Sequence, residues 1–205
     1  MATPILKRRD GDGGAEADRL VALIAAARTG DGAAFRTLVA PHLPLAYRIA
    51  ARMAGPALAE DAVQEALGIV HDKLGRYRPE ASFAGFVCAI VARRASTLAR
   101  SERRRRVHED RSPEGRRTDT PEEIADAKKL AQVVRDALAA LPRKRREAVV
   151  LRLEAGLAYA DIAATLGTSE ESARVLVHLG LKRLEALIAE AGVRLPDAAR
   201  RGGGS

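Results

Sequence analysis

Asp61, Gln64 and Glu65 are spaced at i, i+3 and i+4, so in a helix their side chains share one face. The carboxylates and the amide of such a face can pair with arginine and glutamine side chains of a partner helix. The alternative is a polar face that contacts only water, and these three residues taken alone favour that alternative. Their interpretation as a binding face needs support from the rest of the chain.

A second group of residues combines arginines with an aromatic ring. Arg76, Tyr77 and Arg78 lie in a predicted loop over 75–82 and can offer phosphate contacts beside a stacking surface. The alternative is an ordinary surface loop in which Tyr77 packs on its own domain. The following helix carries arginines that can neutralise phosphates, namely Arg93, Arg94, Arg100 and the run 103–106. By itself, a run such as 103–106 is more often a solvated tail than a reader of bases.

A third feature is the segment 159–184, YADIAATLGTSEESARVLVHLGLKRL, which predicts a helix, a three-residue turn and a longer helix. Gly167 suits the left-handed conformation that ends many helices. Ser169 suits the N-cap of the second helix, and Glu170 and Glu171 follow near the positive end of its dipole. This arrangement is typical of a helix-turn-helix, whose second helix can enter the major groove of DNA. An ordinary antiparallel helix pair fits these residues about equally well.

Residue types that carry enzyme chemistry are scattered along the chain. It has no Gly-rich phosphate loop and no Ser/His/Asp pattern in a credible context. The histidines are far apart in the sequence, so we expect no catalytic residue, no cofactor and no metal site at His42, His71, His108 or His178. Cys88 is the only cysteine, which excludes a disulfide within the chain, and its apolar surroundings predict a small buried core residue.

The 205-residue chain has a formal net charge of +8 and a pI of about 10.2. This balance favours an anionic partner, either nucleic acid or an anionic membrane surface. Segments rich in Ala and Leu, with few aromatic residues, predict an all-α fold. The apolar runs 20–27 and 86–92 are too short to cross a bilayer, and residues 1–14 lack the apolar core of a signal peptide. We therefore expect a cytoplasmic protein without membrane contact.

Prolines, glycines and helical periodicity divide the chain into two helical domains joined by a flexible linker. We expect disorder over 1–16, a first domain over 17–106, a linker over 107–126, a second domain over 127–192 and a flexible tail over 193–205. In the first domain, a helix is predicted at 17–27, and a second begins at 33 and is interrupted at Pro41 and Pro44. Further helices are predicted at 45–53, 58–74 and 83–105. In the second domain, they are predicted at 121–140, 143–154, 159–166 and 170–191.

Two separated segments resemble one protein family in the same order. The first comprises AAARTGDGAAFRTLVAPHLPLAYRIAARMAG and AEDAVQEALGIVHDKLGRYRPEASFAGFVCAIVARRA, and the second is LPRKRREAVVLRLEAGLAYADIAATLGTSEESARVLVHLGLKRLEAL. They are similar to regions 2 and 4 of bacterial sigma factors of the sigma-70 superfamily, of the small extracytoplasmic-function (ECF) type, over about 17–105 and 127–191. Their order and spacing are more specific than the helix-turn-helix alone, which also occurs in response regulators.

The resemblance implies an alternative sigma factor, a non-enzymatic subunit that joins core RNA polymerase and helps to melt a promoter. It assigns Asp61, Gln64 and Glu65 to the coiled-coil clamp of the polymerase β′ subunit. It implies that the loop 75–82 captures a base flipped from the −10 element. The residues expected to contact −10 DNA are Arg76, Tyr77, Arg78, Arg93, Arg94 and Arg100. Contacts to the −35 element would come from Ser172, Arg174, His178, Lys182 and Arg183.

The chain also departs from the family pattern. It has no Trp, which the family often carries near Phe86, and Arg94 occupies a position that is commonly Asn. Leu176 and Leu179 occupy positions where DNA-facing polar groups are expected, and their spacing places them on one helical face. Because exposed apolar clusters often mark a protein contact, we expect region 4 to bind the polymerase β flap or another protein there, with weak −35 specificity. The alternative is that both leucines pack against neighbouring helices.

Other functions stay open on the sequence alone. One is a protein-recruited sigma factor whose region 4 docks a partner rather than reading −35 DNA, and the apolar second helix supports it. Another is a plain helix-turn-helix transcription regulator, which the face of Asp61, Gln64 and Glu65 disfavours. A small enzyme on a helical scaffold is much less favoured. The partners we expect are core RNA polymerase, promoter DNA, and either an anti-sigma factor or a recruiting protein.

Overall fold

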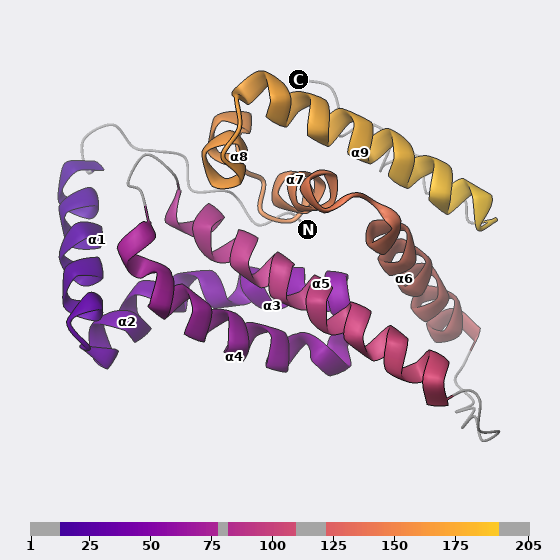
Figure 1. The fold of residues 1–205 in the computed structure, drawn as a ribbon, viewed down its shortest axis with the longest axis horizontal. Helices are drawn as coiled ribbons and strands as arrows, with labels where there is room; N and C mark the ends of the chain where they lie inside the picture. Colours follow the sequence, from indigo (N-terminus) through magenta and orange to yellow (C-terminus); the bar gives the residue numbers. More distant parts are fainter. Residues whose placement is uncertain (1–12, 78–81, 110–121, 193–205) are drawn as a thin grey trace.

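The computed structural model describes residues 13–77, 82–109 and 122–192, and these ranges contain helices and no strand (Figure 1). The first group of helices comprises α1 (Gly13–Arg28), α2 (Gly32–Val39), the short 3₁₀ helix η1 (Ala40–His42), α3 (Leu43–Ala54), α4 (Pro56–Lys73), η2 (Leu74–Arg76) and α5 (Phe83–Glu109). The second comprises α6 (Glu122–Ala140), α7 (Arg143–Leu153), α8 (Tyr159–Leu166) and α9 (Glu170–Glu190). The predicted all-α class is confirmed.

Local sequence signals explain where these helices begin and end. The Asp31 carboxylate accepts hydrogen bonds from the backbone N–H groups of Ala33 and Ala34, which caps α2. The predicted interruption at Pro41 and Pro44 is confirmed, because η1 separates α2 from α3. Gly55 has a φ of 89°, a conformation that favours glycine, and it forms the turn between α3 and α4.

The core of the first group lies where α3, α4 and α5 pack together. Each helix contributes small and branched apolar side chains that are buried, among them Ile49, Val63, Val70 and Val87. Cys88 is buried in the same core, as predicted, and burial raises the pKa of its thiol to about 12. The buried side chains of α7, α8 and α9 belong to the same hydrophobic cluster, so the core extends from the first group into the second.

Several element bounds differ from the sequence-based prediction. The helix α1 begins at Gly13, inside the segment predicted to be disordered, and the rest of that segment lies outside the described residues. The helix α5 extends to Glu109 and α6 begins at Glu122, so both continue into the predicted linker. The remainder of that linker and the predicted tail are also outside the described residues.

The two groups of helices pack against each other, which the sequence did not predict. The helix α5 contacts α7 and α8, and α3 contacts α6, so α5 lies between the two groups (Figure 1). Gly85 permits a close approach, because a Cβ atom at this position would lie 2.8 Å from Oγ1 of Thr165 on α8. The surface that α5 presents to the second group also carries several of the predicted site residues.

Candidate functional site

The predicted binding face on α4 is exposed. Asp61, Gln64 and Glu65 are all accessible, while the opposite side of this helix is buried in the core. The Gln64 amide donates a hydrogen bond of 3.3 Å to the carboxylate of Glu60, one turn earlier. The helix therefore presents a continuous acidic and amide surface that a basic partner can approach.

Glu65 on this face is also an ion-pair partner of Arg94 on α5. The two side chains are partly exposed, with 43% of the Glu65 side chain and 30% of the Arg94 side chain accessible. Arg94 was predicted to contact −10 DNA, and in this arrangement its guanidinium is instead directed to a neighbouring helix. The pair connects the acidic face of α4 to the basic helix α5.

The described part of the predicted base-capturing loop is packed on its own domain. The ring of Tyr77 meets Phe83 edge-on, with 5.2 Å between the ring centroids, and it also lies 5.5 Å from Phe86. Arg76 is exposed at the end of η2, whereas Arg78 lies outside the described residues. This is the alternative that the sequence left open for Tyr77, and it forms an aromatic cluster at the start of α5.

Arg93 on α5 is held by a glutamate from the other group of helices. Its Nε and Nη2 atoms each donate a hydrogen bond of 3.1 Å to the Glu147 carboxylate on α7. The Glu147 side chain is only 3% exposed, whereas the Arg93 side chain is 41% exposed. Because both oxygens of a buried carboxylate are used, this pair fixes the orientation of α5 relative to α7.

The neighbouring residue, Arg146, is a second buried cross-link. Its guanidinium donates to the Ser96 hydroxyl on α5 at 3.0 Å and to the carbonyl oxygens of Ala139 and Leu141, each at 2.8 Å. Burial lowers the pKa of Arg146, and repulsion from Arg100 acts in the same direction. Arg146 therefore ties the ends of α6 and α7 to α5.

Two more ion pairs join the groups at their edges. Nε of Arg52 on α3 lies 2.8 Å from Oε1 of Glu154 at the end of α7. Arg103 on α5 pairs with Asp136 on α6. Of the basic residues predicted on α5, Arg93 and Arg103 thus pair with the second group, and Arg100 is exposed beside them.

The predicted helix-turn-helix is present. Gly167 adopts the left-handed conformation after α8, with a φ of 62° and a ψ of 54°. The Ser169 hydroxyl accepts a hydrogen bond from the backbone N–H of Ser172, as expected for the N-cap of α9. Ser172, His178 and Lys182 are exposed on α9.

Arg174 near the start of α9 is held in place by two neighbours. It forms an ion pair of 2.6 Å with Glu170 and lies over the ring of Tyr159, 4.8 Å from the centroid. Arg152 contacts the same ring at 4.7 Å, so the tyrosine lies near two guanidinium groups. Farther along α9, Arg183 pairs with Glu190.

One part of the predicted apolar surface on α9 needs correction. Leu176 is half-buried and packs against the hydrophobic core, because the inward stripe of α9 is wide enough to include it. Leu179 is 38% exposed, and Val175, one turn earlier, is 54% exposed. The outward apolar pair is therefore Val175 and Leu179, not Leu176 and Leu179.

Comparison with known proteins identifies both groups of helices. The family model "Sigma-70 region 2" matches residues 38–105, and "Sigma-70, region 4" matches residues 131–184. RNA polymerase sigma factor CarQ of Myxococcus xanthus is 35% identical over 166 residues, which cover 78% of this chain and 93% of CarQ. ECF RNA polymerase sigma factor ShbA of Streptomyces griseus is 36% identical, over 81% of this chain and 93% of ShbA. This chain belongs to the ECF sigma factors of the sigma-70 superfamily.

Solved structures agree with this sigma-factor fold. The structure of CnrH in complex with the cytosolic domain of CnrY has a TM-score of 0.58 and 24% identity, and the match covers 85% of this chain and 98% of CnrH. At this identity the likeness concerns the fold. The family makes this chain a regulatory subunit of transcription initiation.

Sequence reasoning missed the acidic partners of the region 2 arginines. Glu147 could have been noticed, because Val150 and Leu151 follow at i+3 and i+4, which places its carboxylate on the apolar face of its helix. No local signal identifies Asp136 or Glu154. Within the described ranges there is no cluster of three or more His, Cys, Asp and Glu residues that could hold a metal ion, and no helix is long and apolar enough to span a bilayer.

Proposed function

We propose that this sigma factor docks on core RNA polymerase through Asp61, Gln64 and Glu65 of α4. The observation that carries the proposal is the exposure of all three side chains on one face of a helix whose other side is buried. A carboxylate–amide–carboxylate surface pairs well with a basic helix such as a coiled-coil clamp. The polymerase supplies catalysis, and the sigma factor supplies promoter choice and opening.

Promoter opening is assigned to the start and the basic side of α5. Arg76, Arg93 and Arg100 offer guanidinium groups for phosphates, and the aromatic cluster around Tyr77 offers rings for an unstacked base. A phosphate at Arg93 would compete with the buried Glu147 carboxylate, which holds two of its three guanidinium nitrogens. We therefore infer that regions 2 and 4 separate when the sigma factor enters the polymerase and meets the promoter.

A second function is recruitment of region 4 by a protein. Val175 and Leu179 expose apolar surface on the helix that would face DNA. Two of the five −35 candidates, Arg174 and Arg183, already have ion-pair partners, while Ser172, His178 and Lys182 are exposed. Apolar side chains at these positions offer no bidentate recognition of a base. We infer that α9 docks a protein through this surface and contributes weak −35 specificity.

The polymerase-docking proposal is tested by co-elution with core polymerase. Reversing two charges on the face, Asp61→Arg with Glu65→Arg, should abolish co-elution while the helical content measured by circular dichroism stays unchanged. Two single variants with the same charge change refine the test. Asp61→Arg should weaken binding to core polymerase. Asp72→Arg, at a highly exposed position farther along α4, should not. Normal co-elution of the folded double variant would contradict the proposed docking face.

A further inference from the structure

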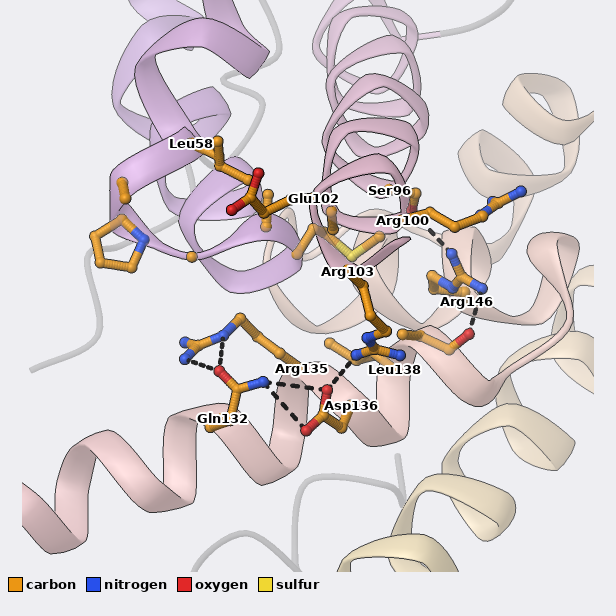
Figure 2. A pocket seen from close by; sticks show the side chains of 17 residues that line it. Leu58, Ser96, Arg100, Glu102, Arg103, Gln132, Arg135, Asp136, Leu138 and Arg146 are labelled. Atoms are coloured by element: carbon orange, nitrogen blue, oxygen red, sulfur yellow. Dashed lines mark hydrogen bonds and ion pairs between the residues drawn. The ribbon is translucent and has the colours of Figure 1, made fainter. Parts of the chain in front are cut away.

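A cavity of about 610 Å³ lies between regions 2 and 4 (Figure 2). One wall is the turn from α3 to α4, residues 53–58; a second is α5 from Ser96 to Arg103; the third is α6 with Arg146 of α7. Its size is within the range of small-molecule sites, about 300–1,000 Å³. Of the residues proposed above to contact polymerase or DNA, Arg100 lines this cavity, so a ligand bound there would also occupy a guanidinium proposed for promoter DNA.

Positive charge dominates the lining. The lining contains four guanidinium groups, those of Arg100, Arg103, Arg135 and Arg146. It contains two carboxylates, those of Glu102 and Asp136, so positive charge exceeds negative charge by two. Asp136 is already paired with Arg103, and Glu102 lies 3.0 Å from Arg105, which is not part of the lining. The two lining carboxylates are therefore occupied by other arginines and do not neutralise Arg100 or Arg135.

Arg100 and Arg135 are the cations available to a ligand. Arg100 is exposed, and no hydrogen bond or ion pair joins it to another described residue. Arg135 donates to the neutral amide oxygen of Gln132 at 2.7 Å (Figure 2). Burial lowers the pKa of Arg146, and repulsion from Arg100 and Arg103 acts in the same direction, whereas Glu147 acts against it. An anion in the cavity would relieve this repulsion.

The backbone adds to the positive potential. The first turn of the 18-residue helix α4 lines the cavity, its N-cap residue is Gly55 without a side-chain cap, and the turn contains no acidic residue. Pro56 has no N–H, and the N–H of Leu58 donates to the Gly55 carbonyl oxygen at 3.3 Å. This turn therefore offers a phosphate or carboxylate the N–H of Ala57 and the helix dipole. Arg135 reaches this turn, because a Cβ atom on Gly55 would lie 3.8 Å from its Nε. Met53, Leu58 and Leu138 give the same cavity an apolar side.

We propose that this cavity binds a small anion with at least two phosphate charges, held between Arg100 of α5, Arg135 of α6 and the first turn of α4. Because region 2 and region 4 both contribute to the site, the ligand stabilises their packed arrangement. In that arrangement Arg93 stays paired with Glu147, so ligand binding opposes promoter binding.

Isothermal titration of the full chain with inorganic pyrophosphate tests the proposal. We expect saturable binding that is weakened about tenfold or more by Arg100→Gln and by Arg135→Gln, since each removes a charge-assisted contact. Arg104→Gln is the matched control: Arg104 is exposed on the same helix, outside the lining, and its loss should leave the affinity within about twofold. Inorganic phosphate should bind more weakly than pyrophosphate.

A second measurement separates a specific site from general attraction to a basic protein. Pyrophosphate should raise the melting temperature of the wild-type chain and of Arg104→Gln, but not that of the Arg100→Gln variant, whose fold is checked by circular dichroism. The proposal is overturned if pyrophosphate does not bind the wild-type chain, or if Arg104→Gln weakens binding as much as Arg100→Gln does. Equal affinity for phosphate and pyrophosphate would also overturn it.

Discussion

Gly180 on α9 and Gly68 on α4 are both helical glycines, but the space around them differs. A Cβ atom at Gly180 would lie 2.5 Å from Cγ2 of Val149 and 3.3 Å from the carbonyl oxygen of Arg145, whereas one at Gly68 would meet nothing within 4 Å. Gly180→Ala should therefore destabilise region 4 by about 1–3 kcal/mol through overpacking. Gly68→Ala should stabilise the protein by about 0.5–1 kcal/mol, because alanine favours the helix.

Chemical denaturation of both glycine variants, followed by circular dichroism, measures these changes. Equal stabilities of Gly180→Ala and the wild-type chain would show that α7 and α9 are not as closely packed as described.

Cys88 makes a second prediction at the scale of one residue. Its thiol is buried and burial raises its pKa to about 12, so the reactive thiolate is scarce in the folded protein. A thiol reagent at pH 8 should leave the native chain unmodified and should label it fully in denaturant. The folded pKa is above the unfolded one, so the stability contributed by the neutral thiol is present below the unfolded value and is lost as the pH rises toward 12. Rapid labelling of the native chain at pH 8 would contradict this burial.

At the scale of an element, α9 combines the capped start expected for the second helix of a helix-turn-helix with an apolar outer face. Scrambling the −35 region of a target promoter should reduce transcription only modestly, because Val175 and Leu179 offer no hydrogen bonds to base edges. Scrambling an equally long upstream segment is the control. In vitro transcription with core polymerase measures both, and a severe loss that depends on Arg174 would show that α9 reads DNA in the usual way.

The aromatic cluster at the start of α5 is the second element with a testable role. If Tyr77 stacks on an unpaired base, Tyr77→Ala should reduce permanganate reactivity of the −10 thymines without loss of polymerase binding. Tyr77→Phe keeps the ring that packs on Phe83 and should retain most of the reactivity. Normal promoter opening by a folded Tyr77→Ala variant would leave this ring a structural role only.

At the scale of the whole molecule, buried and edge ion pairs hold region 2 against region 4. The most buried of them joins Glu147 to Arg93, which we propose as a promoter contact. Arg93→Gln would leave a buried carboxylate with a weaker partner, at a cost of about 1–3 kcal/mol to the packed arrangement. We expect a larger radius of gyration in small-angle X-ray scattering at unchanged helical content. Arg104→Gln is the charge-matched control. An unchanged radius of gyration for Arg93→Gln would mean that apolar packing alone holds region 2 against region 4.

The sequence by itself determined the helices and their order. Caps such as Asp31 and Ser169, the left-handed Gly167 and the prolines near η1 act within a few residues, so their effects can be predicted locally. The exposed face of Asp61, Gln64 and Glu65 also follows from spacing alone, since these residues share one helix.

Only the tertiary structure decided which arginines are engaged and by what. Arg93 and Glu147 are 54 residues apart, and Arg52 and Glu154 are 102 residues apart, so no local pattern connects them. The same packing brought the first turn of α4 beside the arginines of α5 and α6 and created the cavity between regions 2 and 4. Leu176 turned inward for a related reason: the width of a buried helical stripe depends on the helices packed against it.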